Sequence, residues 1–212
     1  MSRQSEDPRL VFLDLETMGL AAHAPVVEIG MIITECSPEP LGVVAEANGI
    51  VSYDDLAWSA ADPIARSMHE KNGLRAAVPP TPAPAFAASS TVLSNVDSWA
   101  AWVLKEHGFA AHSVVLAGNS IHQDRLWIEA QMPRLNEMLH PYKLIDVSAI
   151  RGIVRRFVDG RIGDIVPSDE NHRALGDCRN CRDELLMYLR ALFLHQSHDV
   201  SWELLKLHGA KR

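Results

Sequence analysis

Three apolar, strand-forming runs lie within the first 53 residues with no helical pattern between them, and this order constrains the fold more than any other feature. The runs cover residues 10–15, 26–34 and 42–53 and are joined by short connections. Short apolar runs bounded by turn residues are typical of buried strands. Because consecutive strands on short connections usually pair side by side, the pattern predicts an antiparallel meander.

The rest of the chain alternates between helical patterns and two further strands. The two apolar runs cover residues 113–117 and 143–147. Helical spacing surrounds them, at residues 64–78, 96–104, 121–132, 148–157 and 172–195. Strands that are separated by helices usually enter a sheet in parallel. The sequence therefore predicts an α/β fold with a mixed five-stranded sheet flanked by helices.

The composition is typical of one globular domain. The 212 residues are 47% hydrophobic and 22% charged, which excludes collagen-like, coiled-coil and disordered chains. We expect a single domain over residues 1–212, with a flexible N-terminus at about residues 1–8. The Pro- and Ala-rich segment 78–90 is expected to be a surface loop, since too little chain precedes it to build a separate core.

The charge limits the mode of nucleic-acid binding. Twenty Lys and Arg against 27 Asp and Glu give a net charge of −7, which suits a long phosphate backbone poorly but does not exclude a short substrate. The N-terminus lacks the apolar core of a signal peptide, and no apolar run reaches about 18–20 residues. We therefore expect a cytoplasmic protein with no membrane partner.

The three cysteines do not indicate disulfides or a zinc site. Their odd number argues against a disulfide framework. Cys178 and Cys181 form a single CxxC inside a helical pattern, without a second pair. We expect both to be buried on a helix face.

Two carboxylates, Asp14 and Glu16, end the first predicted strand. Since side chains alternate along a strand, both are expected on one face. Two neighbouring like charges in an apolar strand are unfavourable unless a cation lies between them, which favours a metal. Solvation of Glu16 in the following loop is the alternative.

Three later residues complete the set. Asp124 follows the fourth predicted strand, where open α/β sheets place their sites, although a first-turn acid also stabilises a helix without further function. His172 and Asp177 are five residues apart and cannot share a helix face. They converge only if His172 lies on the preceding loop and Asp177 on the helix.

These motifs resemble those of the DEDD exonuclease superfamily, in the branch that has a histidine in its last motif. The matching residues are Asp14-Leu15-Glu16-Thr17, Asn119-Ser120 with Asp124, and His172-Arg173-Ala174 with Asp177. Within the superfamily the chain most resembles the oligoribonuclease family, through residues 12–20, 116–124 and 142–148. The resemblance implies a ribonuclease H-like fold.

The resemblance also implies a chemistry. Asp14, Glu16, Asp124 and Asp177 would hold two Mg²⁺ or Mn²⁺ ions, and His172 would act as the general base. The implied reaction is 3′-to-5′ hydrolysis of very short RNA, dinucleotides above all, to 5′-mononucleotides. Two alternatives stay open, namely an exonuclease on longer RNA or DNA and a catalytically silent nucleic-acid-binding module.

Six residues are implied to contact substrate. Leu20 would wedge against the bases and His69 is a fainter match, while Ser120, Tyr142, Lys143 and Ser148 would hold the far end. Two residues differ from the family pattern: Lys143 replaces the usual Arg after the Tyr, and Ile64 is found where the family commonly has a Trp before the histidine that matches His69. Both departures concern substrate details and leave the acids intact. The family resemblance further implies a homodimer in which Tyr142 reaches the partner's site.

Overall fold

A computed structural model of the chain describes residues 8–35, 40–78, 92–157 and 172–192. Residues 1–7 of the predicted flexible N-terminus, most of the 78–90 loop, Cys36 and the last three residues of the helical pattern 172–195 lie outside the described residues. None of the helices in the described ranges combines the length and apolarity needed to cross a membrane.

The centre of the molecule is one mixed sheet of five strands, as the sequence predicts. The strands are β1 (Val11–Thr17), β2 (Val26–Glu35), β3 (Gly42–Ile50), β4 (Val114–Gly118) and β5 (Leu139–Asp146). They lie in the order β3-β2-β1-β4-β5. The pairs β1–β2 and β2–β3 are antiparallel, whereas β1–β4 and β4–β5 are parallel. The early meander and the two later crossovers are both present.

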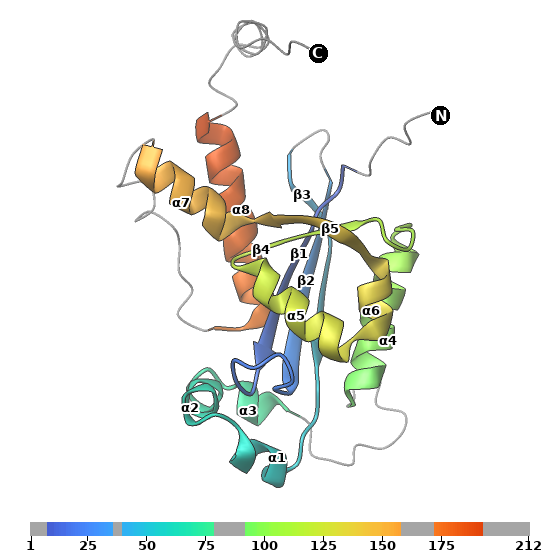
Figure 1. The fold of residues 1–212 in the computed structure, drawn as a ribbon, viewed down its shortest axis with the longest axis vertical. Coiled ribbons are helices and arrows are strands. Elements are labelled where there is room, and N and C mark those ends of the chain that lie inside the picture. Colours follow the sequence, from blue (N-terminus) through green and yellow to red (C-terminus); the bar gives the residue numbers. More distant parts are fainter. Residues whose placement is uncertain (1–7, 36–39, 79–91, 158–171, 193–212) are drawn as a thin grey trace, which may run out of the picture.

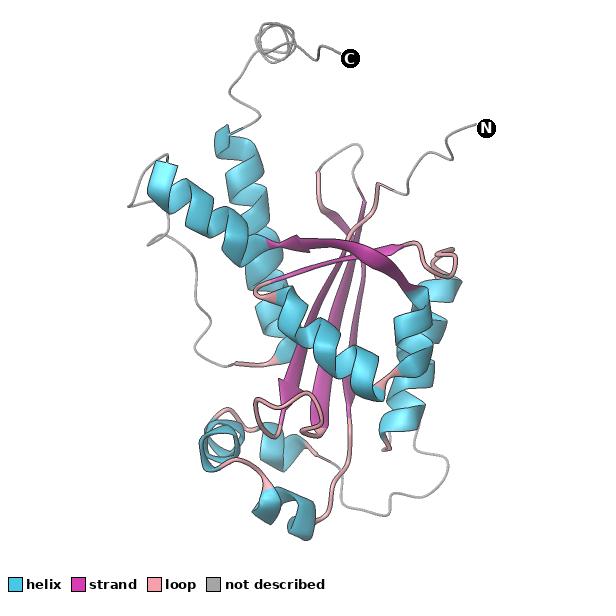
Figure 2. Cartoon of the chain, viewed as in Figure 1, coloured by secondary structure: helices cyan, strands magenta, loops and turns pink. Residues whose placement is uncertain are grey.

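Helices cover both faces of this sheet (Figures 1 and 2). They are α1 (Asp55–Ala60), α2 (Pro63–Lys71), α3 (Leu74–Ala77), α4 (Leu93–Glu106), α5 (Ile121–Gln131), α6 (Pro133–Met138), α7 (Val147–Phe157) and α8 (Ala174–Leu192). On one face, α4, α5 and α6 pack against Val11 and Leu13 of β1. On the other face, α7 and α8 pack against Phe12. The alternation of side chains along β1 thus separates two cores.

The short helices α1 to α3 gather at the end of the sheet where β1 finishes (Figure 1). A third apolar cluster holds them there, and Trp58 and Leu74 are its largest buried members. Helix α1 was not expected from the periodicity. It forms because Asp54 caps it, accepting a hydrogen bond from Ala57 N at 2.8 Å, and because Trp58 is buried.

Strand β5 also starts earlier than predicted, at Leu139 instead of residue 143. Pro141 interrupts the strand pattern in the sequence. Because β5 is the last strand of the sheet, its outer side needs no partner and proline is tolerated there.

Candidate active site

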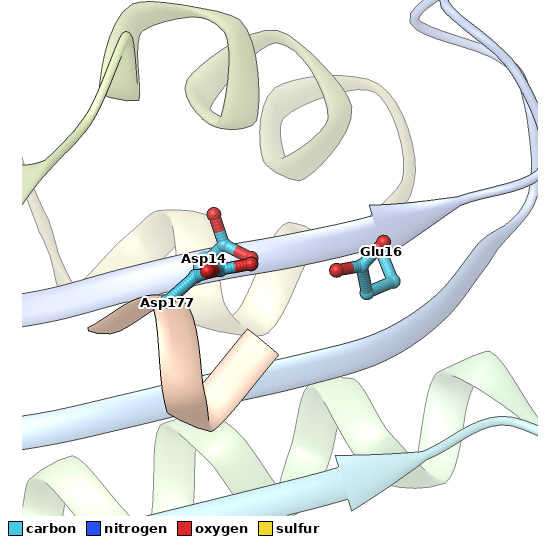
Figure 3. Close-up of side chains that lie close together, drawn as sticks. All are labelled: Asp14, Glu16 and Asp177. Carbon is cyan, nitrogen blue, oxygen red and sulfur yellow. The ribbon is translucent and has the colours of Figure 1, made fainter. Parts of the chain in front are cut away.

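Three carboxylates meet at the end of β1. Asp14 and Glu16 project from the strand, and Asp177 from the first turn of α8 points toward Asp14 (Figure 3). One oxygen of each carboxylate lies within 4.8 Å of the others. In the described part of the chain this is the one group of three or more potential metal-ligating side chains. Residues 163 positions apart in sequence thus form one cluster.

The geometry of β1 and β2 explains the meeting. Asp14 and Glu16 alternate with Leu13 and Leu15 and therefore face α8, on the same side as Phe12. On β2, Gly30 allows α8 to come close, because a Cβ at this position would overlap the backbone of Ala174 and Leu175. This close approach brings the first turn of α8 down onto the strand that carries the acids.

Asp124, the fourth acid, lies in the first turn of α5 and is buried. Its Oδ1 accepts a hydrogen bond from Leu15 N at 3.0 Å. It is not part of the three-carboxylate group, yet its charge is the largest coulombic contribution to the raised pKa of Asp14. The structure therefore brings Asp124 beside the cluster while tying it to the backbone of β1.

The cluster is electrostatically unfavourable without a cation. Burial, followed by the charges of Asp124, Glu16 and Asp177, raises the pKa of Asp14 well above its ordinary value. Burial and then the charge of Asp177 raise the pKa of Glu16 to about 8. Burial raises the pKa of Asp124 to about 7. Buried carboxylate oxygens that repel one another are a suitable ligand set for a hard divalent cation, which would restore their ionised form.

His172 lies immediately before α8, whereas Asp177 lies on it, which is the arrangement that the sequence requires for convergence. The residue is exposed and has a positive φ of 39°. Its carbonyl accepts a hydrogen bond from Asn72 Nδ2 at 2.5 Å. Together with α2 residues that include Ile64 and Lys71, it lines an open cavity of about 550 Å³.

His69 is fully buried behind Glu16 and does not face solvent. Its Nε2 lies 2.9 Å from the carbonyl of Thr17, and its Nδ1 lies 3.8 Å from Glu16 Oε2 without a hydrogen-bond partner. Because a carbonyl only accepts, Nε2 carries the proton. In this conformation the His69 ring lies behind Glu16 and is inaccessible, so it cannot make the direct substrate contact that the resemblance implies.

Two of the predicted substrate-binding residues, Ser120 and Ser148, lie together. Their Oγ atoms are 3.3 Å apart, and Ser148 Oγ accepts a hydrogen bond from Ser120 N at 3.1 Å. Asp146, at the end of β5, organises the pair by accepting from Ser148 Oγ at 2.5 Å and from Ser120 N at 3.2 Å. Its other oxygen lies 3.0 Å from His122 Nδ1.

Of the remaining predicted contacts, Leu20 and Tyr142 are exposed and Lys143 is half-buried. Leu20 follows β1 and is 92% exposed, and Tyr142 of β5 is 79% exposed. The ring of Tyr142 contacts the ring of His140 edge-on, with 4.6 Å between centroids. His140 Nδ1 also accepts the backbone N–H of Lys143 at 3.1 Å. His140 thus orders the part of β5 that carries Tyr142 and Lys143.

Sequence reasoning assigned no role to two strand acids, Glu28, which is buried, and Asp146, which is half-buried. Glu28 lies on β2 and accepts two hydrogen bonds from Arg173 Nε and Nη2, at 2.9 and 2.6 Å. Each acid is the one charged side chain in an otherwise apolar stretch, VVEIGMIIT and LIDV respectively. That signal could have identified both, because a carboxylate in a buried strand needs a specific partner.

The cysteines are buried as expected. Cys178 and Cys181 are 1% and 3% exposed on the face of α8 that packs against the sheet. Burial raises the pKa of both thiols. Since thiolates are the reactive and metal-binding form, this environment favours neither zinc nor redox chemistry.

Comparison with solved structures identifies the fold that this chain shares with known proteins. Two structures of E. coli exonuclease I in complex with DNA match with TM-scores of 0.61 and 0.59, at 13% and 14% identity. The matches cover 88% and 94% of this chain but only 41% and 44% of exonuclease I. The chain therefore shares the ribonuclease H-like fold of these structures, and it spans less than half of exonuclease I.

Curated relatives are more specific, although no family model matches the chain. The oligoribonuclease of Corynebacterium efficiens is 32% identical over 191 residues, which cover 90% of this chain and 81% of the relative. The oligoribonuclease of Rhodococcus jostii is 33% identical over 188 residues, which cover 88% of each chain. The chain belongs to the oligoribonuclease family.

Proposed function

We propose that this protein is a 3′-to-5′ exoribonuclease that hydrolyses very short RNA, dinucleotides above all, to 5′-mononucleotides. The observation that carries the proposal is the group of Asp14, Glu16 and Asp177, of which Glu16 is buried and the other two half-buried, with Asp124 beside it and His172 ahead of α8. The names of the relatives support the same activity. A silent binding module would not need to keep four mutually repelling acids.

Two Mg²⁺ or Mn²⁺ ions are the proposed cofactors. Asp14, Glu16, Asp124 and Asp177 would hold them, because hard oxygen ligands suit both metals. When bound, such ions lower the pKa of a water and offset the charge that develops on the leaving oxygen. The raised pKa values of Glu16 and Asp124 indicate that a cation would replace protons at this site.

His172 is the proposed general base. Its side chain is exposed and lines the cavity beside α2, so water has access to the imidazole. An imidazole takes up a proton near neutral pH, which suits removal of a proton from the attacking water. His69 would act from behind Glu16 by packing, since its Nδ1 lies 3.8 Å from Glu16 Oε2 and makes no hydrogen bond.

Substrate length is the finer part of the proposal. Leu20 would lie against the bases, and Ser120, Ser148, Tyr142 and Lys143 would bind the other end of a short RNA. A net charge of −7 offers little to a long backbone, so binding energy has to come from the two ends. The ammonium group of Lys143 lacks the planar, bidentate geometry of an Arg guanidinium, so it would bind a phosphate less directionally.

We further propose a homodimer. β5 is an edge strand that exposes Tyr142 and Leu144, and the helix that follows it in the chain, α7, exposes Ile153 and Phe157. An edge strand with exposed apolar side chains is a surface on which a second chain can pack. Light scattering is expected to report twice the 23.4 kDa of one chain, and a stable monomer at micromolar concentration would contradict the proposal.

The activity is tested with 5′-labelled RNAs of about two, three, five and ten nucleotides at one salt concentration. We expect the highest initial rate on the dinucleotide, with mononucleotides released from the 3′ end. Asp177→Asn is the inactive control, since an amide lacks the charge that a metal-bound carboxylate supplies. Rates that rise with length would favour an exonuclease on longer strands instead.

A further inference from the structure

A buried ion pair lies directly beside His172. Glu28 of β2 is 1% exposed, and its carboxylate accepts hydrogen bonds from Arg173, the residue that follows His172. The contact is bidentate, with Arg173 Nε 2.9 Å from Oε2 and Arg173 Nη2 2.6 Å from Oε1. Such paired bonds fix direction as well as distance, because both groups are planar.

Glu28 also holds the beginning of α8. Its Oε2 accepts the backbone N–H of Ala174, the first residue of the helix, at 3.2 Å. A carboxylate at this place satisfies a free backbone donor and interacts favourably with the helix dipole. Asn48 of β3 supports Glu28 from the other side, donating from Nδ2 to Oε1 at 2.9 Å.

His172 is therefore restrained on both sides. Asn72 holds its carbonyl, and Glu28 holds the next two residues through Arg173 and Ala174. Between these anchors the backbone of His172 has a φ of 39°, in a region that residues with a Cβ rarely adopt. Such a conformation persists only where the surroundings impose it.

We propose that Glu28 is a positioning residue for His172, acting through Arg173 and Ala174. The proposal rests on the function proposed above, in which His172 is the general base. A role in stability alone explains the arrangement less well, because a buried ion pair can often be replaced by apolar residues without loss of stability. Here the pair joins an inner strand to a segment that holds a defined, unfavourable backbone conformation.

The test is the isosteric substitution Glu28→Gln, compared with Glu46→Gln. Glu46 makes a similar bidentate pair from β3 to Arg179 of α8, but farther along the helix and partly exposed. We expect Glu28→Gln to lower kcat on a dinucleotide by about 10- to 100-fold, with KM changed less than about threefold. Glu46→Gln should leave both constants near the wild-type values. Equal effects of the two variants, or none, would overturn the proposal.

A double variant shows whether Glu28 acts through His172. In a His172→Ala background, Glu28→Gln is expected to cost nothing further, since the group that it positions is already absent. The same loss of kcat in both backgrounds would overturn the proposal and place the effect on the carboxylate cluster. Asn48→Ala removes one support of Glu28 and is expected to lower kcat in the same direction by a smaller factor. It also serves if Glu28→Gln fails the check of folding by circular dichroism.

An NMR measurement that does not depend on enzyme activity tests this proposal separately from the proposed function. In protein labelled with ¹⁵N-histidine, the His172 imidazole signals are identified by their loss in His172→Ala. They should shift or broaden in Glu28→Gln and stay unchanged in Glu46→Gln. Unchanged signals in both variants would overturn the positioning role. If the wild-type protein released no nucleotide from any RNA, the proposed function would fall, while these spectra would still decide whether Glu28 positions His172.

Discussion

Asp124 and Leu15 are hydrogen-bonded between α5 and β1, with Oδ1 of the acid 3.0 Å from the backbone nitrogen. Because Leu15 lies between Asp14 and Glu16, this bond sets the place of the fourth acid relative to the first two. Asp124 thus has two separable properties, an acceptor oxygen that holds two elements together and a negative charge that can bind a cation.

Substitutions at Asp124 should separate these properties. Asp124→Asn keeps an oxygen for Leu15 N and removes the charge, so it should fold with wild-type stability and lose activity by about 10³-fold, on the scale of losing one transition-state contact. Asp124→Ala should also lose about 1–2 kcal/mol of unfolding free energy, because a buried N–H is left unpaired. Urea unfolding and dinucleotide hydrolysis measure the two effects. Equal stability of both variants would contradict the structural role.

The stability of chelated protein should fall as pH rises. The pKa of Glu16 is raised from its ordinary 4.5 to about 8, so between these values the folded state binds more protons than the unfolded state. Unfolding free energy in EDTA should therefore decrease by on the order of 3 kcal/mol from about pH 5 to about pH 8.

Two controls accompany this prediction. Glu16→Gln should reduce the pH dependence, since an amide does not titrate; Asp14 and Asp124, whose pKa values are also raised, would account for what is left. Added Mg²⁺ or Mn²⁺ should restore stability at the higher pH by binding the ionised carboxylates of the folded state. A chelated wild-type protein that becomes more stable over this range would refute the electrostatic account of the cluster.

Loss of the proposed general base should slow the reaction without affecting the fold. His172→Ala should lower kcat by about 10²–10⁴-fold, the usual contribution of general base catalysis. The exposed side chain makes no packing contribution that the substitution would remove, so unfolding free energy should change by less than about 0.5 kcal/mol. Wild-type turnover in this variant would remove His172 from the mechanism.

The close approach of β2 and α8 predicts opposite effects for two glycine substitutions. Gly30→Ala places a methyl group into the backbone of Ala174 and Leu175 and should cost about 3 kcal/mol of stability or more. Gly152→Ala, in the middle of α7, meets no atom within 4 Å and should stabilise by about 0.5–1 kcal/mol. Thermal unfolding of both variants is the measurement, and a neutral Gly30→Ala would contradict the packing.

Local patterns were sufficient for most of the elements and for the mixed, five-stranded character of the sheet. The alternation in LVFLDLE places Asp14 and Glu16 on the face opposite Leu13, because the pleat has a period of two and requires no tertiary information. The patterns failed where tertiary contacts override them. Pro141 interrupts the strand pattern, so the start of β5 at Leu139 was missed. Helix α1 was missed because it depends on the burial of Trp58.

The sequence by itself determined the chemistry available to this protein: the four acids, the histidine outside the helix, and a charge unsuited to long nucleic acid. Only the tertiary structure decided which groups act together. Glu28 and Arg173 are 145 residues apart, and no local rule pairs them. Their contact exists because β2 is an inner strand of the sheet and Gly30 allows α8 to pack closely against it. A buried carboxylate must then find a cation within reach, whatever the separation along the chain.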